Sequence, residues 1–184
     1  PFNCIFSINE SKKIWVLPLF WVFSGLLGGL LCTLTKWILV GKKEEGETVL
    51  IWSKATYMDT IWQAIRTLVA EYLMGMTSGS FLFGIWMKTL GSEVAWDQGA
   101  YVDSTEALLN PEMVKIEKYG SVEREALLFG HIYEGEGGKV KYGKIDIEDG
   151  GFVGSRAVAM PGVTVESGGK LNALSLAMKG EIVG

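Results

Sequence analysis

The sequence of 184 residues has little positive charge, two cysteines and a single histidine. Its 17 basic and 21 acidic residues give a net charge of −4, so it lacks the basic surplus that nucleic-acid binding requires. Two cysteines cannot build a disulfide scaffold, and one histidine cannot supply a zinc site made of three histidines. We therefore expect no metal site and no nucleic-acid partner.

Charged residues of all kinds are also scarce. They make up 21% of the chain, and the mean hydropathy is +0.25, which excludes a disordered chain. Residues 1–91 contain eight basic and six acidic residues, whereas residues 92–184 contain nine and fifteen. This asymmetry predicts a membrane anchor over 1–91 and a water-exposed domain over 92–184. Because the chain starts at Pro1 and stops in mid-pattern at Gly184, we expect a fragment or a processed product.

The longest run without a charge covers 22 residues, from Ile14 to Thr35. As a helix it would be about 33 Å long, enough to cross a hydrocarbon core of about 30 Å. It predicts a transmembrane helix over about 14–40, with a buried core helix as the alternative. Gly25, Gly28 and Gly29 would allow another helix to approach closely.

A second apolar pattern follows after a polar turn. From Tyr57 to Met76, apolar residues recur every three or four positions, which predicts an amphipathic helix over about 54–77. It would lie along the membrane surface or pack against other helices. The polar residues elsewhere on its helical wheel include Asp59, Gln63, Arg66 and Glu71.

The apolar segment Phe81–Leu90 predicts a short helix over about 80–90. It is too short to span a bilayer, so we expect it to be re-entrant, interfacial or buried. We expect membrane lipids and other membrane protein chains to contact this segment and Tyr57–Met76. If the chain is a subunit of a complex, lipids or pigments would bind at these helices.

The second half of the chain contains a six-residue repeat. An aliphatic residue opens each block of six from residue 147 onward, and Ile116, Val122 and Leu128 keep the same spacing. Amphipathic helices need steps of three and four and ordinary strands steps of two, so sixes favour stacked coils of three short strands. The opening residues are Ile147, Val153, Ala159, Val165, Leu171 and Ala177.

These sixes resemble the hexapeptide-repeat, left-handed parallel β-helix family, best known among acyltransferases. The block AMPGVT, residues 159–164, is similar to a common rung of that family. The resemblance implies an α+β membrane protein. N-terminal transmembrane and amphipathic helices would be followed by a left-handed parallel β-helix over 92–184.

A closer resemblance covers most of the chain. The sequence is similar to the membrane-embedded C-terminal region of ε-poly-lysine-synthetase-like nonribosomal peptide synthetases, where membrane helices alternate with acyltransferase-like domains. It implies an integral membrane protein whose β-helix lies outside the bilayer and acts on carrier-bound acyl groups. The matching segments are Lys36–Glu47, Ile51–Lys54, Phe83–Val94, Tyr101–Ser104, Phe129–His131 and Leu174–Glu181.

His131 is the candidate catalytic residue. It precedes a polar, glycine-rich excursion, Glu134–Tyr142, and such excursions are where sites are built. The resemblance implies a general base acting on the acceptor nucleophile, oriented by Glu134 or Glu136. The alternative is a histidine that caps the coil or forms hydrogen bonds within the loop.

Other polar residues carry weaker hypotheses. Asp103 and Ser104 would terminate a strand or line the same groove, and a structural turn is the favoured interpretation. A phosphopantetheine arm or coenzyme A would be the cofactor of an enzyme. Basic residues that could attract it, or simply solvate the surface, are Arg156, Lys170 and Lys179.

Two functions therefore compete, and whether the chain is an enzyme stays open. One is a membrane-anchored acyl- or aminoacyl-transferase-like module that transfers to an amine or hydroxyl through His131. The other is a non-catalytic accessory subunit of a larger membrane complex, respiratory or photosynthetic. The second rests on a fold-level analogy with inactive relatives of γ-class carbonic anhydrases.

Overall fold

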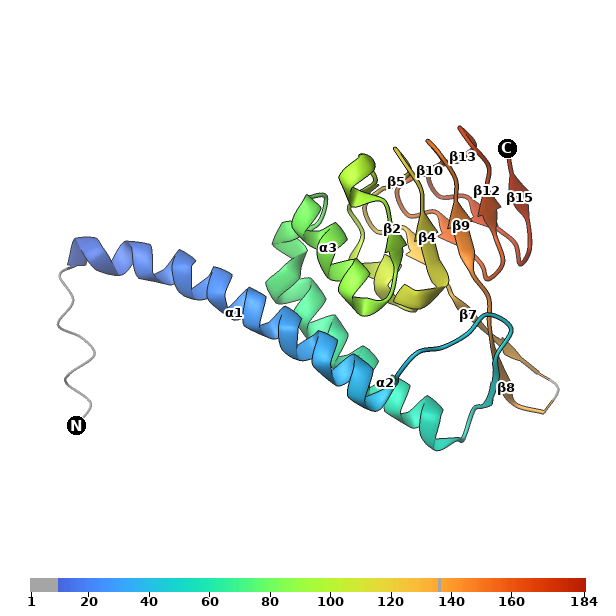
Figure 1. Cartoon of the computed structure of the whole chain (residues 1–184), viewed down its shortest axis with the longest axis horizontal. Coiled ribbons are helices and arrows are strands. Elements are labelled where there is room, and N and C mark those ends of the chain that lie inside the picture. Colours follow the sequence, from blue (N-terminus) through green and yellow to red (C-terminus); the bar gives the residue numbers. More distant parts are fainter. Residues whose placement is uncertain (1–9, 136) are drawn as a thin grey trace.

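The computed structural model describes residues 10–135 and 137–184, and its first element is the long helix α1 (Glu10–Leu39). Residues Val16–Leu39 of α1 are long and apolar enough to cross a membrane. The N-terminal half of α1 projects away from the rest of the molecule (Figure 1), and its side chains from Leu17 to Phe23 are exposed. The described residues thus include one helix suited to membrane anchoring, as the sequence predicts.

Two shorter helices pack beside the second half of α1. Helix α2 (Lys54–Val69) continues through a π turn (Ala70–Met74) and a 3-10 turn (Gly75–Thr77), after which α3 (Phe81–Leu90) begins. The Ser53 side chain accepts a hydrogen bond from the backbone N–H of Thr56 and so caps the start of α2.

Small residues on α1 allow these helices to approach closely. Gly25, Gly29 and Cys32 are buried, and a Cβ atom at Gly29 would lie 3.3 Å from Sδ of Met74. The indole N–H of Trp62 donates to the carbonyl oxygen of Cys32 at 3.2 Å, and that of Trp86 donates to the carbonyl oxygen of Gly29 at 3.2 Å. These contacts hold α1 against both α2 and α3.

Most strands after α3 belong to three parallel sheets of short strands. From Ile145 onward the chain visits them in turn, and residues 18 positions apart are paired, as Val158 is with Leu176. The earlier paired strands are separated by 20, 22 or 31 positions. The first sheet contains β2 (Glu93–Val94), β4 (Val114–Ile116), β9 (Ile145–Ile147), β12 (Thr164–Val165) and β15 (Ile182–Val183). The second contains β3 (Tyr101–Val102), β5 (Ser121–Val122), β10 (Phe152–Val153) and β13 (Lys170–Leu171). The third contains β6 (Leu127–Leu128), β11 (Val158–Ala159) and β14 (Leu176–Ala177).

The aliphatic residues of the six-residue repeat fill the space between these sheets. The six residues that open successive blocks, from Ile147 to Ala177, are all buried. They belong to one hydrophobic cluster that also includes Cys32, Trp62 and Phe83. The sheets and the helices therefore share a continuous core, and burial of this apolar surface is the main force that holds them together.

This architecture shows that the predicted fold class is wrong. We predicted N-terminal transmembrane and amphipathic helices followed by a left-handed parallel β-helix, and the structure does not have that architecture. It has one apolar helix of spanning length among the described residues, and several parallel sheets of short strands. The 3-10 turns Thr105–Leu108 and Pro111–Met113 and an antiparallel hairpin interrupt the run of strands. The reason is that a spacing of six specifies which side chains are buried, but neither the hand nor the continuity of the winding.

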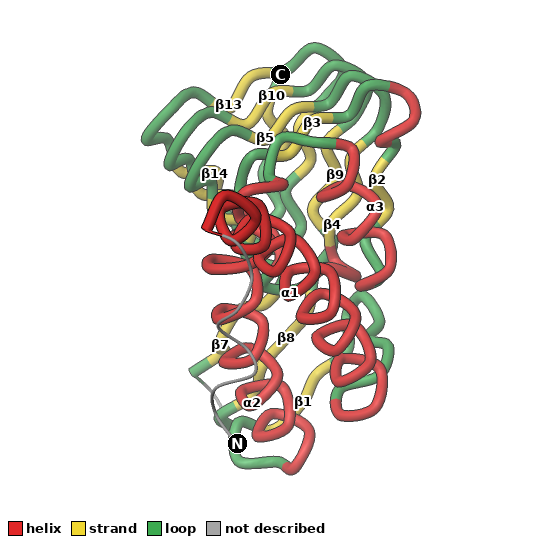
Figure 2. The backbone as a smooth tube through the Cα atoms, turned by 90° about the vertical axis from the view of Figure 1, so that its left-hand side faces the viewer, coloured by secondary structure: helices red, strands yellow, loops and turns green. Residues whose placement is uncertain are grey.

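The interrupting hairpin belongs to a small antiparallel sheet in the order β1–β8–β7. Its strands are β1 (Thr48–Leu50), β7 (His131–Glu134) and β8 (Lys139–Tyr142). Figure 2 shows this sheet beside α2, beyond one end of the parallel sheets. The hairpin thus brings His131 toward the helices.

Candidate functional site

A cavity of about 470 Å³ lies between α2 and the hairpin β7–β8. Its volume is within the range of small-molecule sites, about 300–1,000 Å³. Threonine hydroxyls, two tyrosines, a carboxylate, a guanidinium and an imidazole line it together with three aliphatic side chains. The lining residues are Thr56, Asp59, Thr60, Gln63, Ala64, Arg66, Thr67, Leu109, His131, Tyr133, Val140 and Tyr142.

The hairpin wall follows from the strand register. His131 is paired with Tyr142 and Tyr133 with Val140, so these four side chains share the face that lines the cavity. The ring of His131 packs edge-on against Tyr133, with the ring centroids 5.4 Å apart, and lies 6.2 Å from the centroid of Tyr142. Both aromatic rings therefore pack close to the imidazole.

Asn110 fixes the protonation pattern of that imidazole. Its side-chain oxygen Oδ1 lies 2.6 Å from Nδ1 of His131. Because the amide oxygen only accepts, Nδ1 carries the proton and Nε2 of the neutral ring carries the lone pair. Burial lowers the pKa of His131 below its ordinary value of 6.5, which keeps the ring neutral at pH 7. The arrangement presents an oriented, neutral base.

The structure does not bring Glu134 to the ring of His131. The two residues are three positions apart on β7, so their side chains point to opposite faces of the strand. Glu134 instead accepts a hydrogen bond from Lys179 at 2.9 Å on the surface. The orienting role expected of a glutamate is filled by Asn110, and Glu136 lies outside the described residues.

The other sequence candidates also lie away from the cavity lining. Oδ1 of Asp103 accepts a hydrogen bond from Ser78 at 2.6 Å, and Ser104 donates one to the carbonyl oxygen of Ala126 at 2.8 Å, so both serve local structure. Arg156 is paired with Glu125 at 2.6 Å. The remaining basic candidates, Lys170 and Lys179, are exposed.

The helix wall contributes a buried ion pair. Nζ of Lys43 lies 2.6 Å from Asp59 and 4.5 Å from the ring centroid of Tyr142. Burial alone would lower the pKa of Lys43, but the carboxylate of Asp59 together with Tyr142 raises it above its ordinary value. Burial raises the pKa of the Tyr142 hydroxyl, which therefore stays protonated at pH 7. Lys43, Asp59 and Tyr142 thus form a fixed polar unit beside His131.

Arg66 contributes a second buried cation on the helix side, with 4% of its surface exposed. Its Nε donates to the side-chain oxygen of Gln63 at 2.8 Å, and Nη1 donates to the carbonyl oxygen of Thr105 at 3.1 Å. Gln63 in turn donates to the carbonyl oxygen of Leu109, the residue before Asn110. This series of contacts connects α2 to the segment that orients His131.

Sequence reasoning missed most of these groups. Asp59, Gln63 and Arg66 were assigned to the polar side of an amphipathic helix, and that side covers a cavity inside the molecule. Their spacing of four and three places them on one helical face. If the apolar face of such a helix packs on an anchor, its polar face must point toward the rest of the protein. The shared face of these three residues could therefore have predicted a polar site. Asn110 had no local signal, because it lies 21 residues before His131.

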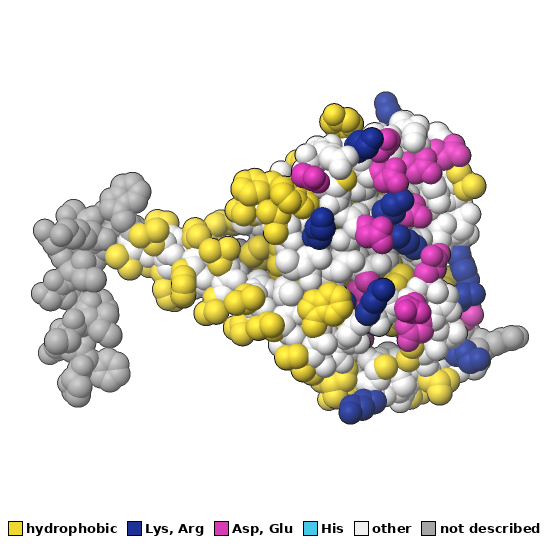
Figure 3. Space-filling view, in the orientation of Figure 1, with side chains coloured by type: hydrophobic (Ala, Val, Ile, Leu, Met, Phe, Trp, Pro, Cys, Tyr) yellow, Lys and Arg dark blue, Asp and Glu magenta, His cyan; other side chains and the backbone are white. Residues whose placement is uncertain are grey.

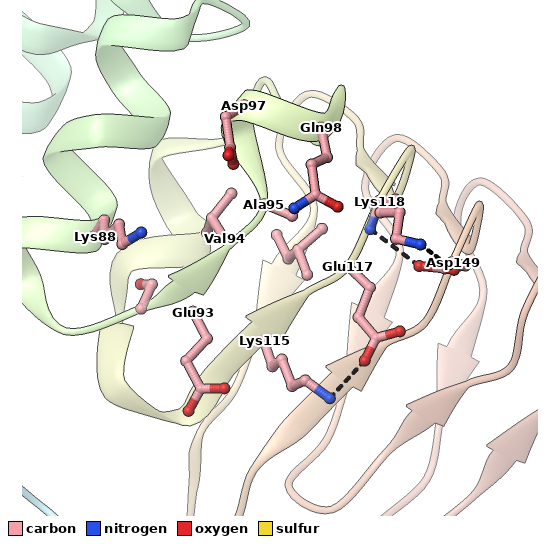
Figure 4. A pocket seen from close by; sticks show the side chains of 12 residues that line it. Lys88, Glu93, Val94, Ala95, Asp97, Gln98, Lys115, Glu117, Lys118 and Asp149 are labelled. Atoms are coloured by element: carbon pink, nitrogen blue, oxygen red, sulfur yellow. Dashed lines mark hydrogen bonds and ion pairs between the residues drawn. The ribbon is translucent and has the colours of Figure 1, made fainter.

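A larger pocket, of about 570 Å³, lies between the end of α3 and the first parallel sheet (Figure 4). Its prominent charges neutralise one another. Nζ of Lys115 lies 2.6 Å from Glu117, and Nζ of Lys118 lies 3.6 Å from Asp149. It holds no histidine, so the smaller cavity is the stronger candidate for chemistry.

Within the described part of the chain, no group of three or more His, Cys, Asp or Glu side chains is placed to hold a metal ion. A scan against protein-family models and a search of the curated proteins found no match to this chain.

Proposed function

We propose that this chain is a membrane-anchored transferase-like module, in which His131 acts as general base on an amine or hydroxyl acceptor. The observation that carries the proposal is the contact between Nδ1 of His131 and Oδ1 of Asn110 in the wall of a cavity of ligand size. It leaves the basic nitrogen Nε2 for an acceptor, in a ring that burial keeps neutral.

The proposed reaction is acyl transfer from a thioester, carried by phosphopantetheine or coenzyme A. Nε2 of His131 takes the proton of the acceptor while the acceptor's nitrogen or oxygen attacks the carbonyl carbon. The tetrahedral intermediate then expels the thiolate, which recovers the proton from Nε2. The products are an amide or ester and a free thiol. The charge of Asp59 favours the transient imidazolium, and that of Lys43, which is paired with Asp59, opposes it.

The proposed placement is integral to a membrane, with the parallel sheets outside the bilayer. Figure 3 supports it, because hydrophobic side chains cover α1 whereas charged side chains gather over the rest of the molecule on that face. The cavity lies beside α2, which packs on the membrane-spanning part of α1. An acceptor or a carrier arm would enter close to the membrane surface.

The test is a transfer assay on the full chain in lipid nanodiscs. The donors are acyl-pantetheine and acyl-coenzyme A thioesters, the acceptors are primary amines and alcohols, and free thiol and product mass are measured. We expect His131→Ala to lower kcat/KM by about 10²–10⁴. The matched control Lys170→Gln changes an exposed side chain outside the cavity lining and should leave the rate unchanged. Full activity of His131→Ala, or no thiol release with any donor, would refute the proposal.

A non-catalytic accessory subunit is the second candidate, and exposed apolar side chains favour it. Trp52 is 96% exposed, and Leu68 and Phe81 are each 62% exposed. However, Trp62 and Val69, on the stripe expected to meet other chains, are buried within this chain. Native mass spectrometry after gentle detergent extraction distinguishes the two, because an accessory subunit should co-purify with a stoichiometric partner chain.

A further inference from the structure

Three cations are buried among the described residues, and one of them, Arg66, is not in contact with a carboxylate. Nearby carboxylates, Glu106 first, favour its charged form without direct contact. Lys36 lies 3.5 Å from Glu112, and Lys43 lies 2.6 Å from Asp59. In the described part of the chain, no carboxylate oxygen lies within 4.0 Å of the guanidinium of Arg66. Arg66 is therefore the one buried cation of this set held only by neutral groups.

The contacts of Arg66 leave its hydrogen-bonding capacity incomplete. Nε donates to Gln63, Nη1 donates to Thr105 and Nη2 lies 3.4 Å from the hydroxyl of Thr67. A guanidinium has five N–H donors, so about two are not used by these contacts. Asp59 is not free to pair with it, because its carboxylate holds Lys43. A buried charge that is not paired with an opposite charge is costly, so a ligand anion that binds the remaining N–H groups would stabilise Arg66.

We propose that Arg66 is an oxyanion subsite: a carboxylate or phosphate group of the ligand docks on its guanidinium inside the cavity. Arginine suits this role because its planar fork matches the oxygens of both groups, whereas a lysine ammonium is a point charge. Arg66 and His131 line the same cavity. A ligand that is held at Arg66 by its anionic end would therefore share the cavity with the imidazole.

This inference rests on the cavity of the proposed function and deepens it, since it names a chemical feature of the molecule that enters. The hydroxyls of Thr56, Thr60 and Thr67 already donate to backbone carbonyl oxygens. On this wall of the cavity, the donors left for an oxyanion are therefore those of the Arg66 guanidinium. The oxyanion has two possible sources. It belongs either to a soluble carboxylate or phosphate, or to the headgroup of an anionic lipid of the membrane that holds α1.

His131 gives a direct reporter, because it is the only histidine in the sequence. Labelling histidine with ¹⁵N and ¹³C in the full chain, in phosphatidylcholine nanodiscs, gives one imidazole signal from the cavity. Sodium acetate and inorganic phosphate are titrated at constant pH and ionic strength, with sodium chloride as the reference salt. We expect a saturable shift of the His131 signal with acetate or phosphate and none with chloride.

Variants at Arg66 decide whether the shift depends on it. Arg66→Met should abolish the shift, and Arg66→Lys, which keeps the charge but loses the planar fork, should weaken binding by about tenfold or more. If Arg66→Met fails to fold, Arg66→Lys still tests the proposal. The matched control Arg156→Gln removes an exposed guanidinium paired with Glu125 and should bind as the wild type does. A shift that is absent in the wild type, or equal in the wild type and both Arg66 variants, would overturn the proposal.

A second arm identifies the source of the oxyanion. In phosphatidylglycerol nanodiscs, a lipid headgroup on Arg66 would shift the His131 signal without added salt and weaken acetate and phosphate binding. An unchanged signal with intact binding assigns the subsite to a soluble ligand. Binding that depends on Arg66 without any transferase activity supports the subsite and refutes the proposed function. Transferase activity without such binding supports the proposed function and refutes the subsite.

Discussion

Replacing Gly154 by alanine tests how tightly the parallel strands are packed. Gly154 follows β10 and is buried against the segment that follows the neighbouring strand β13. A Cβ atom there would lie 2.5 Å from the backbone nitrogen of Ala173 and 2.9 Å from its Cα. Ordinary contacts to a Cβ atom begin near 3.4 Å, so the segments that follow β10 and β13 must separate by most of an ångström.

Two hydrogen bonds flank that contact and limit the separation. The N–H of Gly154 donates to the carbonyl oxygen of Leu171 at 2.8 Å, and that of Leu174 donates to the carbonyl oxygen of Ser155 at 3.1 Å. Overpacking costs about 1–3 kcal/mol, and weakening each hydrogen bond costs up to about 1 kcal/mol. The lower entropy of the unfolded alanine chain offsets about 0.5 kcal/mol. We expect Gly154→Ala to lower the free energy of unfolding by about 2–3 kcal/mol.

The measurement is urea unfolding of the detergent-solubilised protein, combined with hydrogen exchange of peptides from residues 170–184. With a slope of about 2 kcal/mol per molar, the urea midpoint should fall by about 1–1.5 M, and these peptides should lose protection first. The matched control is Gly135→Ala, because no described atom lies within 4 Å of the added Cβ. Equal stability of wild type and Gly154→Ala, or an equal loss in the control, would refute the reasoning.

Three further changes test the buried ion pair of Lys36 with Glu112, His131 itself and its partner Asn110. Lys36→Met leaves Glu112 buried without its partner and should destabilise the fold by about 3–5 kcal/mol. Adding Glu112→Leu should recover most of that loss, measured by thermal unfolding. Strictly additive effects of the two changes would show that the two groups are not coupled. Because burial lowers the pKa of His131, the unfolded chain takes up a proton at this residue more readily than the folded chain does. The free energy of unfolding therefore falls as the pH drops below the unfolded pKa near 6.5 and through the folded pKa. His131→Gln should therefore show a shallower fall in urea midpoint below pH 6.5, and identical pH profiles would contradict this. Asn110→Ala should allow the Nε2–H tautomer of His131 as well, seen as averaged ¹⁵N shifts of its single imidazole, and an unchanged Nδ1–H pattern would argue against Asn110 as the orienting group.

Local patterns were reliable guides where one physical cause acts along the chain. The run of apolar residues in α1 predicted a helix of spanning length. The physical reason is that main-chain polar groups in hydrocarbon must form their hydrogen bonds within the helix. The spacing of six predicted the buried residues from Ile147 to Ala177, because each short strand turns one aliphatic side chain inward. His131 was singled out because it is the only histidine.

Other features depend on contacts between distant segments, and local patterns do not contain them. The fold class inferred from the repeat was wrong, since the hairpin β7–β8 and the 3-10 turns break the run of strands. Glu134 was expected at the imidazole because it is near in sequence, but strand alternation turns it away. Asn110 fills that role because the turn before Pro111 reaches the start of β7.

The sequence by itself determined the apolar anchor, the identity of the buried aliphatic residues and the one histidine available for chemistry. These follow from hydrophobicity and spacing, which are properties of short stretches. Only the tertiary structure decided that the polar face of α2 closes over the hairpin, and that Asn110 sets the tautomer of His131. It also decided that Lys36 and Lys43 each contact a carboxylate, whereas no carboxylate among the described residues contacts Arg66. Pairing of buried charges depends on which distant segments the shared core brings together, and no single segment specifies that.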